Sequence, residues 1–160
     1  MKKVYISGKM TGLKPRQIKK IFGKTEKRII ENNPDIYVMN PAVTYNMLKY
    51  DAFSYEDWLR IDFAMIDACD AIVMIPNWKD SIGAKREIAY AYKHNKKVYY
   101  PNFKLGETVG SWFENEELTR EVTLEVEKHD VKKQLDELFD TFVEKAAIEN
   151  IIGDLKNGKI

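Results

Sequence analysis

A short apolar run, a helix-length segment and a second apolar run follow one another between residues 71 and 100, and this pattern constrains the fold more than any other. The two runs comprise residues 71–75 and 97–100, and the segment between them begins near Gly83. The order predicts a parallel β-α-β unit. Because ligands of such sheets bind beyond the carboxyl ends of the strands, the loop 76–83 and the start of the helix mark the expected site.

Glu87 is the candidate functional residue of this helix, since it lies about one turn after Gly83. Helical spacing alone favours a solvated glutamate beside Lys85 and Arg86. The position at the carboxyl edge of the sheet favours a functional carboxylate instead. The preceding turn offers an N-cap, a small residue and, at Gly83, a backbone that a ligand can approach closely.

Two further strands and two further helices are expected upstream. The run from Lys2 ends at Gly8, and helical spacing of apolar residues follows from Ile18 to Ile30. A second strand is predicted at residues 36–39, followed by a long connection over residues 41–53. Ser54-Tyr55-Glu56-Asp57 has the pattern of a capping box and starts the next helix. These elements indicate an α/β domain with a mainly parallel sheet.

Asp62 is the second candidate, because its neighbours at helical spacing are Trp58, Leu59, Met65 and Ile66. An unpaired carboxylate among apolar side chains is costly to bury, so it needs a partner or a substrate. The alternative is that Asp62 lies at the polar edge of the stripe and bonds nearby backbone.

Composition excludes several classes of function. The 160 residues suit one domain, and 26 basic against 25 acidic side chains leave a net charge of +1. No nucleic-acid polymer and no membrane is therefore expected as partner. The single cysteine, Cys69, excludes an internal disulfide, and the sequence contains no targeting segment or 18-residue apolar run, which predicts a cytoplasmic protein.

Other chemistries lack their motifs. The two histidines, His94 and His129, have no surroundings typical of a Ser-His-Asp arrangement. No metal site and no cofactor are expected, since zinc and calcium spacings are missing. Gly8 and Gly12 form neither a Walker loop nor a dinucleotide fingerprint. The loop after Gly8, with Lys9 and Arg16, is a weak candidate for binding a phosphate.

Three segments together resemble the nucleoside 2-deoxyribosyltransferase superfamily, and more closely its small, often phage-borne members. They are VYISGKM, SYEDWLRIDFAMIDACDAIVMIPNW and DSIGAKREIAYAYKHNKKV, and the resemblance covers about residues 3–100. It implies a flavodoxin-like three-layer fold with a four- or five-stranded sheet. It also implies cleavage or transfer at the N-glycosidic bond of a nucleoside or nucleoside 5′-monophosphate, in which a helix glutamate attacks the anomeric carbon and no cofactor takes part.

The resemblance assigns roles to residues by position. Glu87 matches the nucleophile, Asp80 the aspartate before the helix, Asp62 the acidic residue ahead of Asp70, and Tyr5 the tyrosine that holds the nucleophile. This chain has two residues between Asp80 and Gly83, where the family has one. The substrate-binding positions it implies are Ser7, Gly8, Lys9, Trp78, Ser81 and Gly83.

The region beyond Tyr100 lies outside the resemblance. Residues 101–117 are expected to form an irregular loop or lid, and residues 122–126 suit an edge strand or a helix. From Asp130 a helical pattern continues for about seven turns. The expected organisation is an α/β domain over 1–128 with a helical extension over 129–160.

Such a length of helix favours contact with a second subunit, so a homo-oligomer is expected. Two other functions stay open. One is a non-catalytic nucleotide-binding or sensing module of the same fold, and the other is an oligomeric interaction protein that uses the C-terminal helix.

Overall fold

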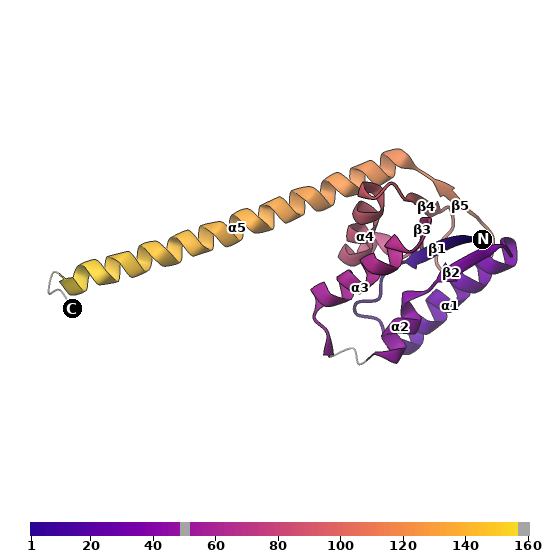
Figure 1. Cartoon of the computed structure of the whole chain (residues 1–160), viewed down its shortest axis with the longest axis horizontal. Coiled ribbons are helices and arrows are strands. Elements are labelled where there is room, and N and C mark those ends of the chain that lie inside the picture. Colours follow the sequence, from indigo (N-terminus) through magenta and orange to yellow (C-terminus); the bar gives the residue numbers. More distant parts are fainter. Residues whose placement is uncertain (49–51, 157–160) are drawn as a thin grey trace. The chain divides into compact units, whose positions relative to one another are not determined.

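The computed structural model describes residues 1–48 and 52–156 and divides into two compact units, Met1–Thr123 and Leu124–Ile160. The sequence prediction treats residues 129–160 as a helical extension of the same domain. Figure 1 shows the elements in chain order: β1 (Lys2–Ser7), α1 (Pro15–Asn32), β2 (Ile36–Met39), α2 (Pro41–Met47), α3 (Tyr55–Asp67), β3 (Ala71–Met74), α4 (Ile82–Lys93), β4 (Lys97–Pro101), β5 (Trp112–Glu114) and α5 (Glu116–Lys156).

The strands form one sheet in the order β2-β1-β3-β4-β5. The first four are mutually parallel, and β5 joins the edge of β4 in the antiparallel direction. Ser7 pairs with Met74, so β1 and β3 end side by side at the carboxyl edge. This order is the flavodoxin-like one, and it confirms the predicted α/β fold with a mainly parallel sheet.

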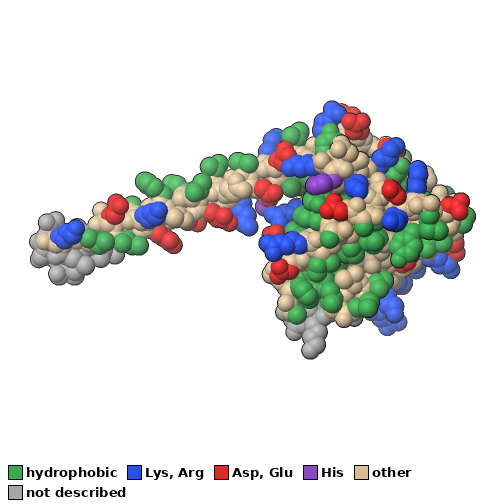
Figure 2. Space-filling model, in the orientation of Figure 1, with side chains coloured by type: hydrophobic (Ala, Val, Ile, Leu, Met, Phe, Trp, Pro, Cys, Tyr) green, Lys and Arg blue, Asp and Glu red, His purple; other side chains and the backbone are tan. Residues whose placement is uncertain are grey.

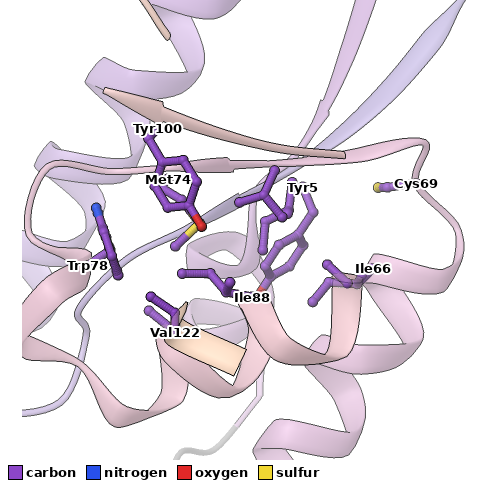
Figure 3. Packing of buried hydrophobic residues seen from close by; sticks show 12 residues of the cluster. Tyr5, Ile66, Cys69, Met74, Trp78, Ile88, Tyr100 and Val122 are labelled. Carbon is purple, nitrogen blue, oxygen red and sulfur yellow. The ribbon is translucent and has the colours of Figure 1, made fainter. Parts of the chain in front are cut away.

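Alternation along the strands builds two cores, one on each face of the sheet. On β1, Val4 and Ile6 belong to the core under α1 and α2, whereas Tyr5 belongs to the core under α3 and α4. The helices thus cover both faces, as Figure 1 shows. Figure 3 shows the second core, in which Tyr5 of β1 lies near Ile66 of α3 and Ile88 of α4. These packing contacts fix α3 and α4 relative to β1, which is what positions the site.

The helix starts follow from local capping, and one of them escaped the sequence analysis. Ser54 and Asp57 form the predicted capping box of α3. Ser81 caps α4 by accepting a hydrogen bond from Ala84 N at 3.1 Å. The predicted long connection over 41–53 is wrong in its first half, because it contains α2. Asn40 caps that helix through Ala42 N at 3.0 Å, and proline at the first helical position supports it.

The predictions for the C-terminal region need two corrections, and of the two alternatives for residues 122–126 the helical one is confirmed. The segment 101–117 contains strand β5, in which Trp112 donates a hydrogen bond to Met74 O at 2.9 Å. Residues 122–126 are helical, and α5 begins at Glu116 rather than at Asp130. The helix starts early because its first turns pack on the domain, with Val122 buried in the core. Neither α5 nor any other helix in residues 1–48 and 52–156 has the length and apolar character needed to cross a membrane.

Candidate functional site

A pocket opens at the carboxyl edge of the sheet, between the loop after β1 and helices α3 and α4. Two buried carboxyl groups, of Asp62 and Glu87, form part of its lining. Its volume is about 40 Å³, enough for a few water molecules, so a larger ligand requires its wall to move. The full lining comprises Gly8, Met10, Thr11, Tyr45, Tyr55, Trp58, Leu59, Asp62, Ser81, Gly83, Ala84 and Glu87.

Two hydroxyl groups from β1 hold the carboxyl group of Glu87 by hydrogen bonds. Tyr5 Oη donates to Glu87 Oε1 over 2.9 Å, and Ser7 Oγ donates to Glu87 Oε2. Tyr5 and Ser7 are two positions apart on the strand, so their side chains face the same helix layer. Each carboxylate oxygen therefore has its own donor, and the carboxyl group is fixed in orientation while only 6% of Glu87 is exposed.

Asp62 reaches the same pocket from α3 and is equally buried, with 7% of the residue exposed. Its Oδ1 atom is buried and accepts no hydrogen bond. The alternative that this carboxyl bonds nearby backbone at the edge of the helix stripe does not account for that atom. A buried acceptor without a donor is unfavourable, so the site is set up for a proton or a ligand.

The two carboxyl groups perturb each other. Burial raises the pKa of Asp62 to about 6, against which hydrogen bonding with Tyr5 and Glu87 acts. Burial also raises the pKa of Glu87 well above its usual range. The charge of Asp62 and hydrogen bonding with Asp62 add to this, while the hydrogen bonds from Ser7 and Tyr5 oppose it. Burial, followed by the charges of Glu87 and Asp62, raises the pKa of Tyr5, which keeps its hydroxyl a donor. Two interacting buried carboxyls share a proton near neutral pH.

The hydrogen bonds differ between the two carboxyl groups, and this difference affects which of them is stabilised in its ionised form. Both oxygens of Glu87 accept from hydroxyl groups, which stabilises its ionised form. Asp62 Oδ1 has no donor, so protonation removes an unfavourable charge there. The two hydroxyl donors thus favour the charged form of Glu87, whereas burial, the charge of Asp62 and hydrogen bonding with Asp62 favour its protonated form.

Aromatic side chains form the outer wall of the pocket, and the sequence analysis did not single them out. Tyr45 and Trp58 stack with their ring centroids 4.1 Å apart, and Tyr55 lines the pocket next to Gly83. A signal for Trp58 was present, since it is one of the apolar neighbours of Asp62. Tyr45 belongs to α2, the helix that was missed. Flat apolar faces of this kind favour binding of an aromatic ring.

The structure brings some of the predicted site residues into the pocket and leaves others outside. Glu87, Asp62, Gly8, Ser81 and Gly83 line it. Ser7, predicted to bind substrate, is instead buried behind the pocket and holds Glu87.

Three predicted residues lie elsewhere. Trp78 is a core residue whose ring centroid lies 5.3 Å from that of Tyr100. Figure 3 shows both side chains in this core. Asp80 ends the turn Trp78–Asp80 and is exposed outside the pocket lining. Lys9 does not line the pocket, and its backbone pairs with the side chain of Asn77. Ser81 takes the cap position of α4, so Asp80 falls in the preceding turn.

A larger hollow of about 810 Å³ lies on the other face of the sheet, lined by residues that include Ile29, Val73, Tyr99 and Trp112. The buried charged and polar side chains of the described chain are Ser7, Thr25, Asp62, Glu87, Thr119 and Thr123, and none of them lines this hollow. The chemistry is therefore concentrated in the smaller pocket.

Gly8 is required by a close approach of two loops at the pocket floor. A Cβ atom there would lie 2.7 Å from Asn77 Oδ1 and 2.8 Å from Ile75 Cβ. Gly8→Ala is expected to destabilise the fold by about 1–3 kcal/mol through overpacking. The matched change Gly23→Ala, inside α1 with no atom within 4 Å of the new Cβ, is expected to stabilise by about 0.5–1 kcal/mol. Urea titration of both variants measures the difference, and equal midpoints would contradict the close approach.

The fold and the site together define an α/β protein with a buried pair of carboxyl groups in a pocket at the carboxyl edge of its sheet. Residues 2–100 match a domain of unknown function, DUF4406, and the chain belongs to this family. No curated protein and no solved structure matches the chain. The matched region includes Tyr5, Asp62 and Glu87 and ends before β5 and α5.

Proposed function

We propose that this protein cleaves or transfers at the N-glycosidic bond of a nucleoside, deoxynucleoside or nucleoside 5′-monophosphate. One observation carries the proposal: Glu87 is a buried carboxylate with a hydroxyl donor on each oxygen, and it shares its pocket with a second buried carboxyl, that of Asp62. Glycosyl transfer through a covalent intermediate uses two carboxyl groups, one as the nucleophile and one as the acid and base.

In the first step of the proposed reaction, a Glu87 oxygen attacks the anomeric carbon of the sugar. The bond from that carbon to the base nitrogen breaks, its electron pair goes to the base, and Asp62 supplies the proton that neutralises the base. The product is a glycosyl ester of Glu87. The hydroxyls of Tyr5 and Ser7 orient the attacking carboxylate throughout.

The second step releases Glu87. A water molecule, or a second base, attacks the anomeric carbon, and ionised Asp62 accepts the proton that the attacking group loses. Hydrolysis and transfer thus differ only in the acceptor. The raised pKa of Asp62, about 6, suits a group that gives and takes a proton near neutral pH.

The pocket wall supports a nucleoside as the substrate class. Tyr45, Tyr55 and Trp58 line the pocket beside the carboxyl pair, and aromatic surface of this kind favours contact with a base. The pocket in its present volume admits only a small group, so binding requires this wall to open.

The test is a panel of the common nucleosides, deoxynucleosides and their 5′-monophosphates, incubated with the full chain with and without a free acceptor base. Chromatography of the products is expected to show free base without an acceptor for a hydrolase, or base exchange for a transferase. Binding without turnover, measured by calorimetry on the same panel, would instead support the non-catalytic module. Neither turnover nor binding would contradict both functions.

A further inference from the structure

Helix α5 carries an unpartnered apolar face in the second compact unit. Six large apolar side chains on it are between 49% and 70% exposed: Val131, Leu135, Leu138, Phe139, Phe142 and Val143. We call them the α5 stripe. Figure 2 shows hydrophobic side chains at the surface along this helix. Within residues 124–156, the described part of the unit, α5 is the one element, so the unit itself offers nothing to cover the stripe.

The spacing of the stripe is that of a helix-to-helix seam. Val131, Leu135, Leu138 and Phe142 follow one another at intervals of four, three and four residues. These intervals place all four on one side of the helix, as the core positions of a coiled coil. Lys128 and Lys145 lie where this pattern would continue and limit the seam to about three turns.

We propose that the α5 stripe binds the same stripe of a second copy of this chain. In a dimer with two-fold symmetry the same surface of each copy forms the interface, so that surface must be complementary to itself. A row of aliphatic and aromatic side chains along a helix satisfies this condition, because such rows interdigitate. Most of the stability of a helix in water comes from packing of its apolar face. A second copy supplies that packing for a segment whose apolar side chains are otherwise in solvent.

The size of the stripe fits a pair of copies. Six side chains that each expose roughly 100 Å² give on the order of 600 Å² per copy, hence about 1,200 Å² for the pair, the lower limit of stable interfaces. An anionic membrane is the other kind of surface that binds amphipathic helices, but the net negative charge of this segment disfavours such binding. Residues 124–156 contain nine acidic and five basic side chains.

Sedimentation velocity of the full chain between 1 and 100 µM tests the proposal, with the wild type expected to sediment as a dimer at the upper end. The double variant Leu135→Gln/Phe142→Gln is expected to raise the dissociation constant by at least about a hundredfold, since two buried side chains per copy are lost. The matched control is Ile148→Gln. It removes a side chain that is 56% exposed on a nearly opposite side of α5, and it is expected to leave the constant unchanged.

Three results would overturn the proposal. A wild type that stays monomeric at 100 µM excludes the pair, and a dimer that survives the double variant places the interface elsewhere. Cosedimentation of a monomeric wild type with anionic lipid vesicles assigns the stripe to a membrane. Far-UV circular dichroism and the melting temperature of each variant are measured alongside, because both variants are expected to retain the folded α/β unit.

Discussion

Glu87→Gln is expected to lower the rate of base release by three or more orders of magnitude. The amide keeps the size of the side chain and cannot form the glycosyl ester, so the covalent route is lost. One of the two hydroxyls, of Tyr5 and Ser7, still donates to the amide oxygen, and the other can turn to accept from the amide nitrogen. The variant is therefore expected to fold and to bind nucleoside, which separates loss of chemistry from loss of structure. Single-turnover chromatography of released base measures the effect.

The same variant has a stability signature. Burial raises the pKa of Glu87, so its ionised form disfavours the folded state, and the neutral amide is expected to raise the melting temperature at pH 8. Asp80→Asn is the control, because Asp80 is exposed and lies outside the pocket lining. It is expected to change neither rate nor melting temperature. Undiminished base release by Glu87→Gln would exclude Glu87 as the nucleophile.

Asp62→Asn is expected to lower base release by about two to four orders of magnitude, because an amide cannot transfer a proton to the departing base. A 7-methylguanine nucleoside provides the internal check. Its base already carries a positive charge and leaves without protonation, so Asp62→Asn is expected to release this base in a single turnover nearly as fast as the wild type does. Glu87→Gln is expected to fail on both substrates. Equal losses on both substrates for Asp62→Asn would assign Asp62 a structural role rather than that of the acid.

The pH dependence of Asp62→Asn has a definite direction. The charge of Asp62 is one of the causes that raise the pKa of Glu87, so its removal lowers that pKa. The acidic limb of the rate profile, which reports ionisation of Glu87, is therefore expected to move to lower pH in the variant. The measurement uses the 7-methylguanine nucleoside, because that substrate keeps the variant active. A limb that stays in place would show that the two carboxyls do not interact.

Stability changes with pH in the same variant. The pKa of Asp62 is raised from 3.8 to about 6 in the folded state, so the folded state holds its proton while the unfolded chain loses it. The contribution of Asp62 to wild-type stability is therefore expected to fall as pH rises from about 4 to about 6, by up to about 3 kcal/mol, and to stay lower above that. Asp62→Asn removes this loss. Urea titration is expected to show the variant more stable at pH 8 and equal to the wild type near pH 4.

Much of the fold is predictable from local pattern. The apolar runs of β1, β2, β3 and β4 and the capping box of α3 all occur where the sequence indicates them. These elements can be predicted from short stretches of sequence, because the apolar pattern of a strand and the cap of a helix depend on residues close in the chain. The start of α5 and strand β5 were missed for the opposite reason. Val122 is helical and buried because it packs on residues of distant elements, and Trp112 is placed by its bond to Met74.

The site follows the same division. Glu87 was identified from its place after a buried strand, and Asp62 from its apolar neighbours. The aromatic wall was not, because Tyr45 comes from a helix that only the structure revealed. Asp80 shows the reverse: its position in the sequence predicted a site residue, and the structure has it in an exposed turn because Ser81, not Asp80, caps α4.

The amino-acid sequence by itself determined a parallel β-α-β core with a carboxylate at the carboxyl edge, since period-two and period-3.6 spacing record which faces are buried. Tertiary structure alone decided which groups meet. Tyr5 and Ser7 lie 82 and 80 residues before Glu87, and contacts over that separation depend on strand order and helix packing rather than on neighbouring residues. The raised pKa of Asp62 also depends on tertiary structure, because it results from burial of this side chain against β1 and α4.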